Sequence, residues 1–170
     1  MIETEYKYSI PAESAKLYLE KLTLGLLPNE KIVDIVTMEQ FYLADADNVA
    51  VRGRISSHTN GDSNAILAIK SANAGLSRLE IEKNLTEDEA SALSKLAVSR
   101  LTKTRYIIEC KDSVWDFDVF SGNLDGTVYA EIEVANESVE FDMISCTNMV
   151  LVDGREHSNA FLANLVSNTN

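Results

Sequence analysis

The sequence has few of the residues that form disulfide frameworks, zinc sites or membrane spans. Its 170 residues include only 2 cysteines and 2 histidines. Cys110 and Cys146 lack partners at metal-ligand spacing, so we expect both to be reduced thiols. No run of about 18 apolar residues occurs, and no apolar signal segment opens the chain. These absences predict a cytoplasmic protein that does not span a membrane.

Positive charge is also scarce. Lysine and arginine number 15 against 27 aspartates and glutamates, which gives a net charge of −12. Such an excess argues against a surface that binds DNA or an anionic membrane, so we expect neither as a partner. A basic minority gathered on one internal surface would still attract an anion. The hydrophobic content of 45% is enough for the core of one domain, residues 1–170.

What the chain does contain is charge at every second position. Glu3, Glu5 and Lys7 open the sequence with this spacing, and alternate side chains of a strand share one face. The spacing returns in five later pairs: Arg52/Arg54, Glu80/Glu82, Lys103/Arg105, Asp116/Asp118 and Glu131/Glu133. One such pair is typical of a solvated sheet face. The repetition instead favours a barrel with charges inside and apolar residues outside.

The pattern of elements indicates an α+β protein. Strands are expected over residues 2–9, 38–44, 49–56, 64–70, 76–83, 103–110, 113–120 and 127–134. Turn residues between them favour antiparallel hairpins. Helices are expected over residues 11–22, 86–98 and 159–166, with a short one near 138–144. The second begins with a capping box from Thr86 to Glu89.

These charges suit one kind of chemistry. Strand geometry holds paired acids about 6–7 Å apart, where they repel one another unless a multivalent cation lies between them. Carboxylate oxygens suit Mg²⁺ or Mn²⁺ better than zinc. Basic side chains that converge from other strands would bind a polyphosphate. Together these features predict phosphoryl transfer, in which positioning and charge neutralisation provide most of the catalysis.

An ordered series of motifs resembles the CYTH superfamily, the triphosphate tunnel metalloenzymes, and most closely their small bacterial inorganic triphosphatases. The series covers about residues 1–135 and begins with Glu3-x-Glu5-x-Lys7. The later matches are Gln40–Leu43, Val51–Ile55, Ala68–Lys70, Gly75–Glu82, Lys103–Tyr106, Asp118–Phe120 and Ala130–Val134. A lone first motif would be weak evidence, whereas the ordered series is specific.

The resemblance implies a closed eight-stranded antiparallel β-barrel around a triphosphate tunnel, with helices packed outside. It implies Mg²⁺ or Mn²⁺ ligands at Glu3, Glu5, Asp118, Glu131 and Glu133. It implies substrate-binding residues at Lys7, Arg52, Arg54, Lys70, Arg78, Lys103 and Arg105. Lys7 and Tyr42 occupy the positions viewed as a catalytic dyad in the family.

The implied activity is metal-dependent hydrolysis of inorganic triphosphate to pyrophosphate and phosphate, by a monomer or a homodimer. Alternatives are a nucleoside or thiamine triphosphatase, a class IV-type adenylyl cyclase, a non-catalytic polyphosphate or nucleotide binder, and a purely structural β-domain. The C-terminus departs from the family pattern, because Glu156-His157 stands where an Arg-Tyr pair is usual. We expect His157 to be a solvent-exposed residue at a helix start.

Overall fold

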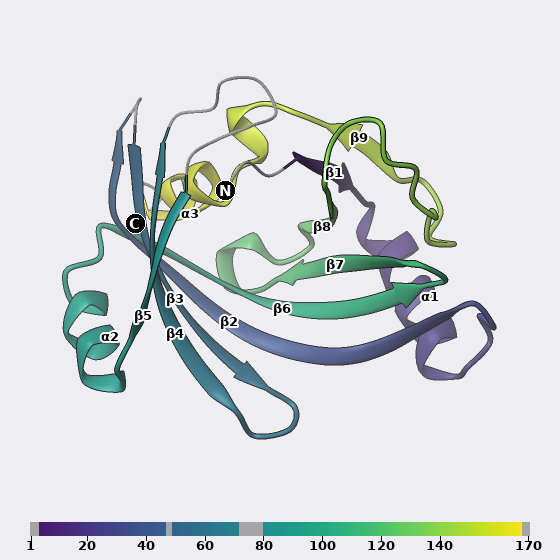
Figure 1. Ribbon diagram of the computed structural model, residues 1–170, viewed down its shortest axis with the longest axis horizontal. Coiled ribbons are helices and arrows are strands. Elements are labelled where there is room, and N and C mark those ends of the chain that lie inside the picture. Colours follow the sequence, from purple (N-terminus) through teal and green to yellow (C-terminus); the bar gives the residue numbers. More distant parts are fainter. Residues whose placement is uncertain (1–3, 47–48, 72–79, 168–170) are drawn as a thin grey trace.

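The computed structural model describes residues 4–46, 49–71 and 80–167. In these residues nine strands form one antiparallel sheet in the order β5-β4-β3-β2-β6-β7-β8-β1-β9 (Figure 1). The strands are β1 Thr4–Ser9, β2 Glu30–Ala46, β3 Val49–His58, β4 Ser63–Ser71, β5 Glu80–Leu85, β6 Ser99–Cys110, β7 Ser113–Phe120, β8 Val128–Val134 and β9 Val150–Val152. The helices are α1 Ala12–Thr23, α2 Glu87–Ser94 and α3 Asn159–Ser167, with 3-10 turns η1 Gly122–Leu124 and η2 Arg155–His157.

The prediction of a closed barrel was wrong. A barrel requires every strand to have two neighbours, but within the described residues β5 and β9 each pair with only one. The short strand β9, which the sequence pattern did not predict, pairs with the outer edge of β1, where Tyr8 lies opposite Leu151. Because β9 occupies that edge, β5 has no access to it. The antiparallel pairing is confirmed, but the sheet is open and curved and does not enclose a tunnel.

Most of the expected elements are present, with different bounds. The strand expected from residue 38 is the second half of β2, which begins at Glu30. Thr86 accepts from Glu89 in the predicted capping box, but α2 ends at Ser94, earlier than expected. The segment 138–144 forms no helix. It is held instead by Asp142, whose carbonyl accepts from the Trp115 indole at 2.8 Å.

Strand β2 joins the two halves of the sheet. Its 17 residues pair with β3 over Val36–Ala46 and with β6 over Glu30–Tyr42. The register shifts between Tyr42 and Ala44 on one side and between Ile32 and Asp34 on the other. Such irregularities bend a strand and increase its twist. In Figure 1, β2 accordingly arcs across the whole width of the molecule.

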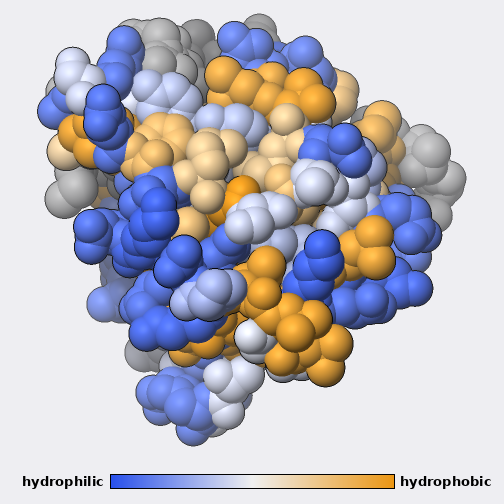
Figure 2. Space-filling view, turned by 90° about the vertical axis from the view of Figure 1, so that its right-hand side faces the viewer, coloured by the Kyte–Doolittle hydropathy of each residue, from blue (hydrophilic) through white to orange (hydrophobic). Residues whose placement is uncertain are grey.

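Helix α1 covers one face of the sheet. Ala15, Tyr18 and Leu22 of α1 belong to the same buried cluster as Trp115 and Phe117 of β7. None of the described helices is long and apolar enough to cross a lipid bilayer. On the side of the molecule shown in Figure 2, hydrophobic side chains form separate groups divided by hydrophilic ones.

One glycine of the sheet is required by packing. Gly53 lies opposite Phe41 in the β2–β3 register. A Cβ atom at Gly53 would lie 2.0 Å from the Phe41 ring, which is fully buried. Glycine therefore lets this ring approach the β3 backbone closely, on the face of the strand opposite to the Arg52 and Arg54 side chains.

Both cysteines are buried free thiols, and we expect them to react slowly. Burial, followed by the charge of Glu30, raises the pKa of Cys146 to about 11 and also raises the pKa of Cys110. A rise of about two units lowers the thiolate fraction near pH 8 roughly 100-fold. Titration with a chromogenic disulfide should detect both thiols rapidly in denaturant and far more slowly in the native protein. Rapid reaction of both native thiols would contradict this prediction.

Candidate functional site

The register of the strands places the ionic side chains on one face of the sheet. Directly opposed residues of antiparallel strands share a face. Lys7 lies opposite Glu131, and Glu131 lies opposite Asp116. We call this surface the ionic face. Its other charged positions include Glu5 and Glu133, Lys103, Arg105 and Asp118, Arg52 and Arg54, Lys70, and Glu82.

Arg105 is the centre of an ion-pair network on this face. Its Nε and Nη2 donate to the two carboxylate oxygens of Asp118, both at 2.7 Å. Nη2 also donates to Glu131 at 3.0 Å, and Nη1 contacts Asp116. The guanidinium group therefore bridges three carboxylates that come from two neighbouring strands, β7 and β8.

Two lysines complete the network. Lys103 contacts Asp118, and both side chains are fully buried. Lys7 forms a 2.7 Å salt bridge with Glu131, and its side chain is 13% exposed. Lys7 and Arg105 therefore retain some access to solvent, whereas Lys103 has none.

The network shifts the pKa values of its members. Burial alone would raise the pKa of Glu131, but Lys7, Lys103 and Arg105 outweigh it and hold that pKa well below its usual range. Burial opposes the charge of Arg105 as well, yet the three carboxylates raise its pKa. For Lys103 burial outweighs the attraction of Asp118 and lowers the pKa. The network thus keeps Glu131 and Arg105 ionised.

Asp116 differs from the other carboxylates. Burial raises its pKa, Arg105 opposes that rise, and the nearby charges of Asp118 and Glu131 add to it. Asp116, Glu131, Glu133 and Val114 line a hollow of about 200 Å³. Asp116 alternates with Asp118 in the sequence but was not among the metal ligands that the family resemblance implied. That alternation was the signal that both residues face the same side.

The remaining basic residues lie across β2. Arg52 is buried, and Arg54 and Lys70 are half-buried, on β3 and β4. They share the ionic face with the network but are separated from β6 by β2. Glu3 and Arg78, also expected in the site, lie outside the described residues.

Tyr42 lies in a packed part of the ionic face. It is 3% exposed, and its hydroxyl donates to the Gln40 side chain at 3.4 Å. It belongs to a second buried cluster with Phe120, Tyr129 and Leu162, the last from α3. Three strands separate β2 from β1 in the sheet order, a path of about 19 Å at the usual strand spacing. The sheet therefore does not place Tyr42 on a strand adjacent to that of Lys7.

His157 is not solvent-exposed, contrary to our expectation. It is half-buried in η2, and its Nδ1 lies 3.0 Å from the Tyr129 hydroxyl. Tyr129 could not be picked out from the sequence, because an uncharged residue two positions before Glu131 does not extend the pattern of alternating charges. Its position on the ionic face follows from the alternation along β8.

The carboxylates of this face are suitable ligands for a divalent cation, but the described residues do not form a preformed coordination site. Glu5 lies opposite Glu133, next to the hollow lined by Asp116 and Glu131. Carboxylate oxygens of this kind are the ligands that Mg²⁺ and Mn²⁺ prefer. Among the described residues, however, no three Asp, Glu, His or Cys side chains are grouped closely enough to hold a metal. The carboxylate ligands therefore suit Mg²⁺ or Mn²⁺, but these side chains would have to move closer together to coordinate a cation.

A family comparison adds to the geometry. Residues 1–143 match the CYTH domain. The chain belongs to the CYTH family. This confirms the family that the motif series predicted. Strand β9, η2 and α3 lie beyond the matched CYTH residues.

Individual relatives agree with this assignment. An inorganic triphosphatase of Acetivibrio thermocellus is 32% identical over 77 residues, a match that spans 44% of this chain and 49% of that protein. The match thus covers about half the length of that relative. The crystal structure of the inorganic triphosphatase NE1496 has a TM-score of 0.57 at 21% identity and covers 96% of this chain and 95% of its own. The PH1012 protein of Pyrococcus horikoshii OT3 has a TM-score of 0.56 at 19% identity and 79% coverage of both chains. At such identities the two structures show a shared fold.

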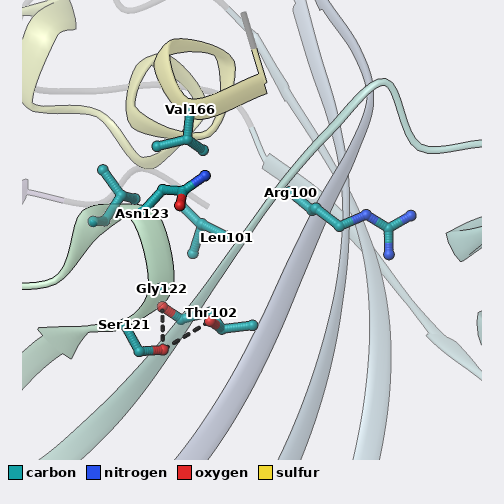
Figure 3. A pocket seen from close by; sticks show the side chains of 8 residues that line it. Arg100, Leu101, Thr102, Ser121, Gly122, Asn123 and Val166 are labelled. Atoms are coloured by element: carbon teal, nitrogen blue, oxygen red, sulfur yellow. Dashed lines mark hydrogen bonds between the residues drawn. The ribbon is translucent and has the colours of Figure 1, made fainter. Parts of the chain in front are cut away.

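A second hollow, of about 140 Å³, lies between α3, η1 and β6 (Figure 3). Ser121 and Thr102 line it and are joined by a hydrogen bond of 2.8 Å between their hydroxyl groups. Arg100 points away from the other labelled residues and pairs with Glu39 at 3.1 Å. Because its lining contributes no charge to the network, we place the candidate site of the CYTH domain on the ionic face.

Proposed function

We propose that this protein hydrolyses inorganic triphosphate to pyrophosphate and phosphate with the help of Mg²⁺ or Mn²⁺. The observation that carries the proposal is the network in which Lys7, Lys103 and Arg105 meet several carboxylates on one face. Membership of the CYTH family and the similarity to an inorganic triphosphatase support it. A face that only bound anions would gain nothing from so many acids.

The accessible cations of the network would bind the phosphate chain. Lys7 and Arg105 are each 13% exposed, so they can exchange a carboxylate partner for a phosphate oxygen. Glu131 would then need a new counter-charge. A divalent cation, when bound, supplies positive charge to this carboxylate and to the phosphate oxygens. Lys103 is fully buried and acts through Asp118, which holds the Arg105 guanidinium in place.

The face beyond β2 would extend the binding site. Arg52, Arg54 and Lys70 lie on the same side of the sheet and would bind further phosphate oxygens. Glu5 and Glu133 would join Glu131 and Asp116 as cation ligands. These assignments bring acidic and basic side chains together on β1, where Glu5 and Lys7 share the ionic face, and this suits a substrate that carries its own metal ion.

A phosphate-release screen tests the proposed function. Inorganic triphosphate, thiamine triphosphate, ATP and pyrophosphate should each be assayed with Mg²⁺, with Mn²⁺ and with a chelator, alongside an assay for cyclic AMP. We expect the highest kcat/KM for inorganic triphosphate and no turnover with the chelator. A higher kcat/KM for another substrate would contradict inorganic triphosphate as the substrate and indicate another activity of the CYTH family. Tight binding of triphosphate without turnover would contradict catalysis.

The proposed pairing of Lys7 with Tyr42 has its own test. Tyr42→Phe should lower kcat more than it raises KM, because a hydroxyl that orients water acts mainly in the transition state. If the two residues work as a unit, the double variant Lys7→Ala/Tyr42→Phe should be little worse than Lys7→Ala alone. Steady-state kinetics of the four proteins measures this coupling. Fully additive losses would show that Tyr42 serves packing in its buried cluster.

A further inference from the structure

The ammonium group of Lys7 lies on an aromatic ring at the edge of the network. Its Nζ is 4.5 Å from the centre of the Tyr129 ring and 2.7 Å from Glu131. Tyr129 and Glu131 are two residues apart on β8, so both project onto the ionic face. One strand therefore offers the same cation both a carboxylate and the negative face of a ring.

The Tyr129 ring is held from its other sides. It is 6% exposed and meets the Phe120 ring nearly at right angles, with centres 6.1 Å apart. Its hydroxyl lies 3.0 Å from Nδ1 of His157, and the two rings are 5.9 Å apart, edge to face. The Phe120 ring, the His157 ring and the hydrogen bond to Nδ1 therefore constrain the Tyr129 ring.

The ring contact and the salt bridge respond differently to an incoming anion. Lys7 has to exchange Glu131 for phosphate if the proposed function holds, and a lysine released from its salt bridge regains rotamer freedom. The contact with Tyr129 involves no carboxylate, so it can persist during this exchange. The ring can hold the ammonium in place while the charged partner changes.

We propose that Tyr129 is a positioning residue for Lys7 and that His157 fixes the orientation of the Tyr129 ring. The C-terminal segment that carries His157, which lies beyond the matched CYTH residues, is then part of the site. Where the inference concerns turnover, it rests on the proposed function. The placement of Lys7 on the ring can be tested without activity.

Nuclear magnetic resonance tests the placement. Protons above an aromatic face are shifted upfield, so the Lys7 Hε signals, assigned by their loss in Lys7→Arg, should lie upfield of those of other lysines. Tyr129→Leu should abolish the shift, and Tyr129→Phe should keep most of it because the ring remains. His157→Ala should reduce it, whereas His157→Gln, which can still hydrogen-bond, should preserve it. His58→Ala is the matched control. His58 pairs with Asp34 and lies on β3, which β2, β6 and β7 separate from β8, so its loss should leave the Lys7 signal unchanged.

Kinetics tests the consequence. In Tyr129→Leu we expect kcat for triphosphate to fall about tenfold with a smaller change in KM, and Tyr129→Phe should restore most of it. His157→Ala should lower kcat about threefold in the native background and add nothing to Tyr129→Phe. If Tyr129 and His157 served only stability, their substitution would not lower kcat selectively over KM, and the effects of Tyr129→Phe and His157→Ala would not be coupled.

The outcomes of these experiments distinguish the positioning role of Tyr129 from the proposed hydrolysis of triphosphate. An unshifted Lys7 signal in the native protein, or a signal that does not respond to Tyr129→Leu, would overturn the positioning role even if triphosphate is hydrolysed. If Tyr129→Leu does not fold, a Lys7 signal that is unchanged in His157→Ala overturns the role of His157. An upfield Lys7 signal in a protein that hydrolyses no triphosphate would refute the proposed function and leave the placement of Lys7 supported.

Discussion

Glu133→Gln should lower metal-dependent phosphate release by about 100-fold or more, and Glu5→Gln should do the same. The two glutamates lie opposite each other on β1 and β8, beside the hollow that Asp116 and Glu131 line. Glutamine keeps the shape of the side chain but removes the charge that would bind a cation. Because the change relieves repulsion between carboxylates, the fold should stay intact.

Phosphate release across a Mg²⁺ titration, together with urea unfolding, measures both halves of this prediction. Glu140→Gln is the matched control, since this glutamate is exposed and lies outside the sheet. It should leave the rate unchanged. Full activity of Glu133→Gln and Glu5→Gln at ordinary metal concentrations would show that these side chains bind no cation.

Arg105→Leu should give the largest loss of stability, about 3–5 kcal/mol, because it leaves buried carboxylates without their counter-charge. The guanidinium of Arg105 is the common partner of Asp116, Asp118 and Glu131. The control is Arg100→Leu on the same strand, whose side chain is 52% exposed and pairs with Glu39. That exposed pair should contribute less than about 1 kcal/mol. Urea unfolding near neutral pH measures both variants.

The loss of stability in Arg105→Leu should also depend on pH. The network lowers the pKa of Glu131, so its stabilisation is present above the ordinary pKa of a glutamate and disappears as the pH falls through the folded value. Removing Arg105 weakens this effect, and the difference between the native protein and Arg105→Leu should therefore narrow in acid. Equal losses in Arg105→Leu and Arg100→Leu, or a difference that is independent of pH, would contradict the network described above.

The sequence predicted most of the strands and the face that carries the charges, because both follow from local alternation. Glu131 and Glu133 have to face the same side of any strand that contains them, and so do Asp116 and Asp118. Alternation cannot tell which of the two aspartates is enclosed. Asp118 is fully buried between Lys103 and Arg105, whereas Asp116 lines a hollow, and this difference depends on packing between strands.

The closure of the sheet could not be read from the sequence for a similar reason. Whether two edge strands pair depends on contacts between distant segments, and the strand that covers the edge of β1 has only three residues, Val150–Val152. A run of three residues is too short to show the alternation of polar and apolar side chains that identifies a strand. The contact between His157 and Tyr129 is also long-range, joining residues 28 positions apart that no motif connects.

If the ionic face binds a polyphosphate as proposed, β2 determines the distance that the bound anion has to span. Strand β2 separates the Arg52/Arg54 row on β3 from the Lys103/Arg105 row on β6, and two strand spacings amount to about 10 Å. An anion that touches both rows has to bridge β2. In the proposed function, the position of β2 between the two rows would therefore set the length of anion that can contact both rows at once.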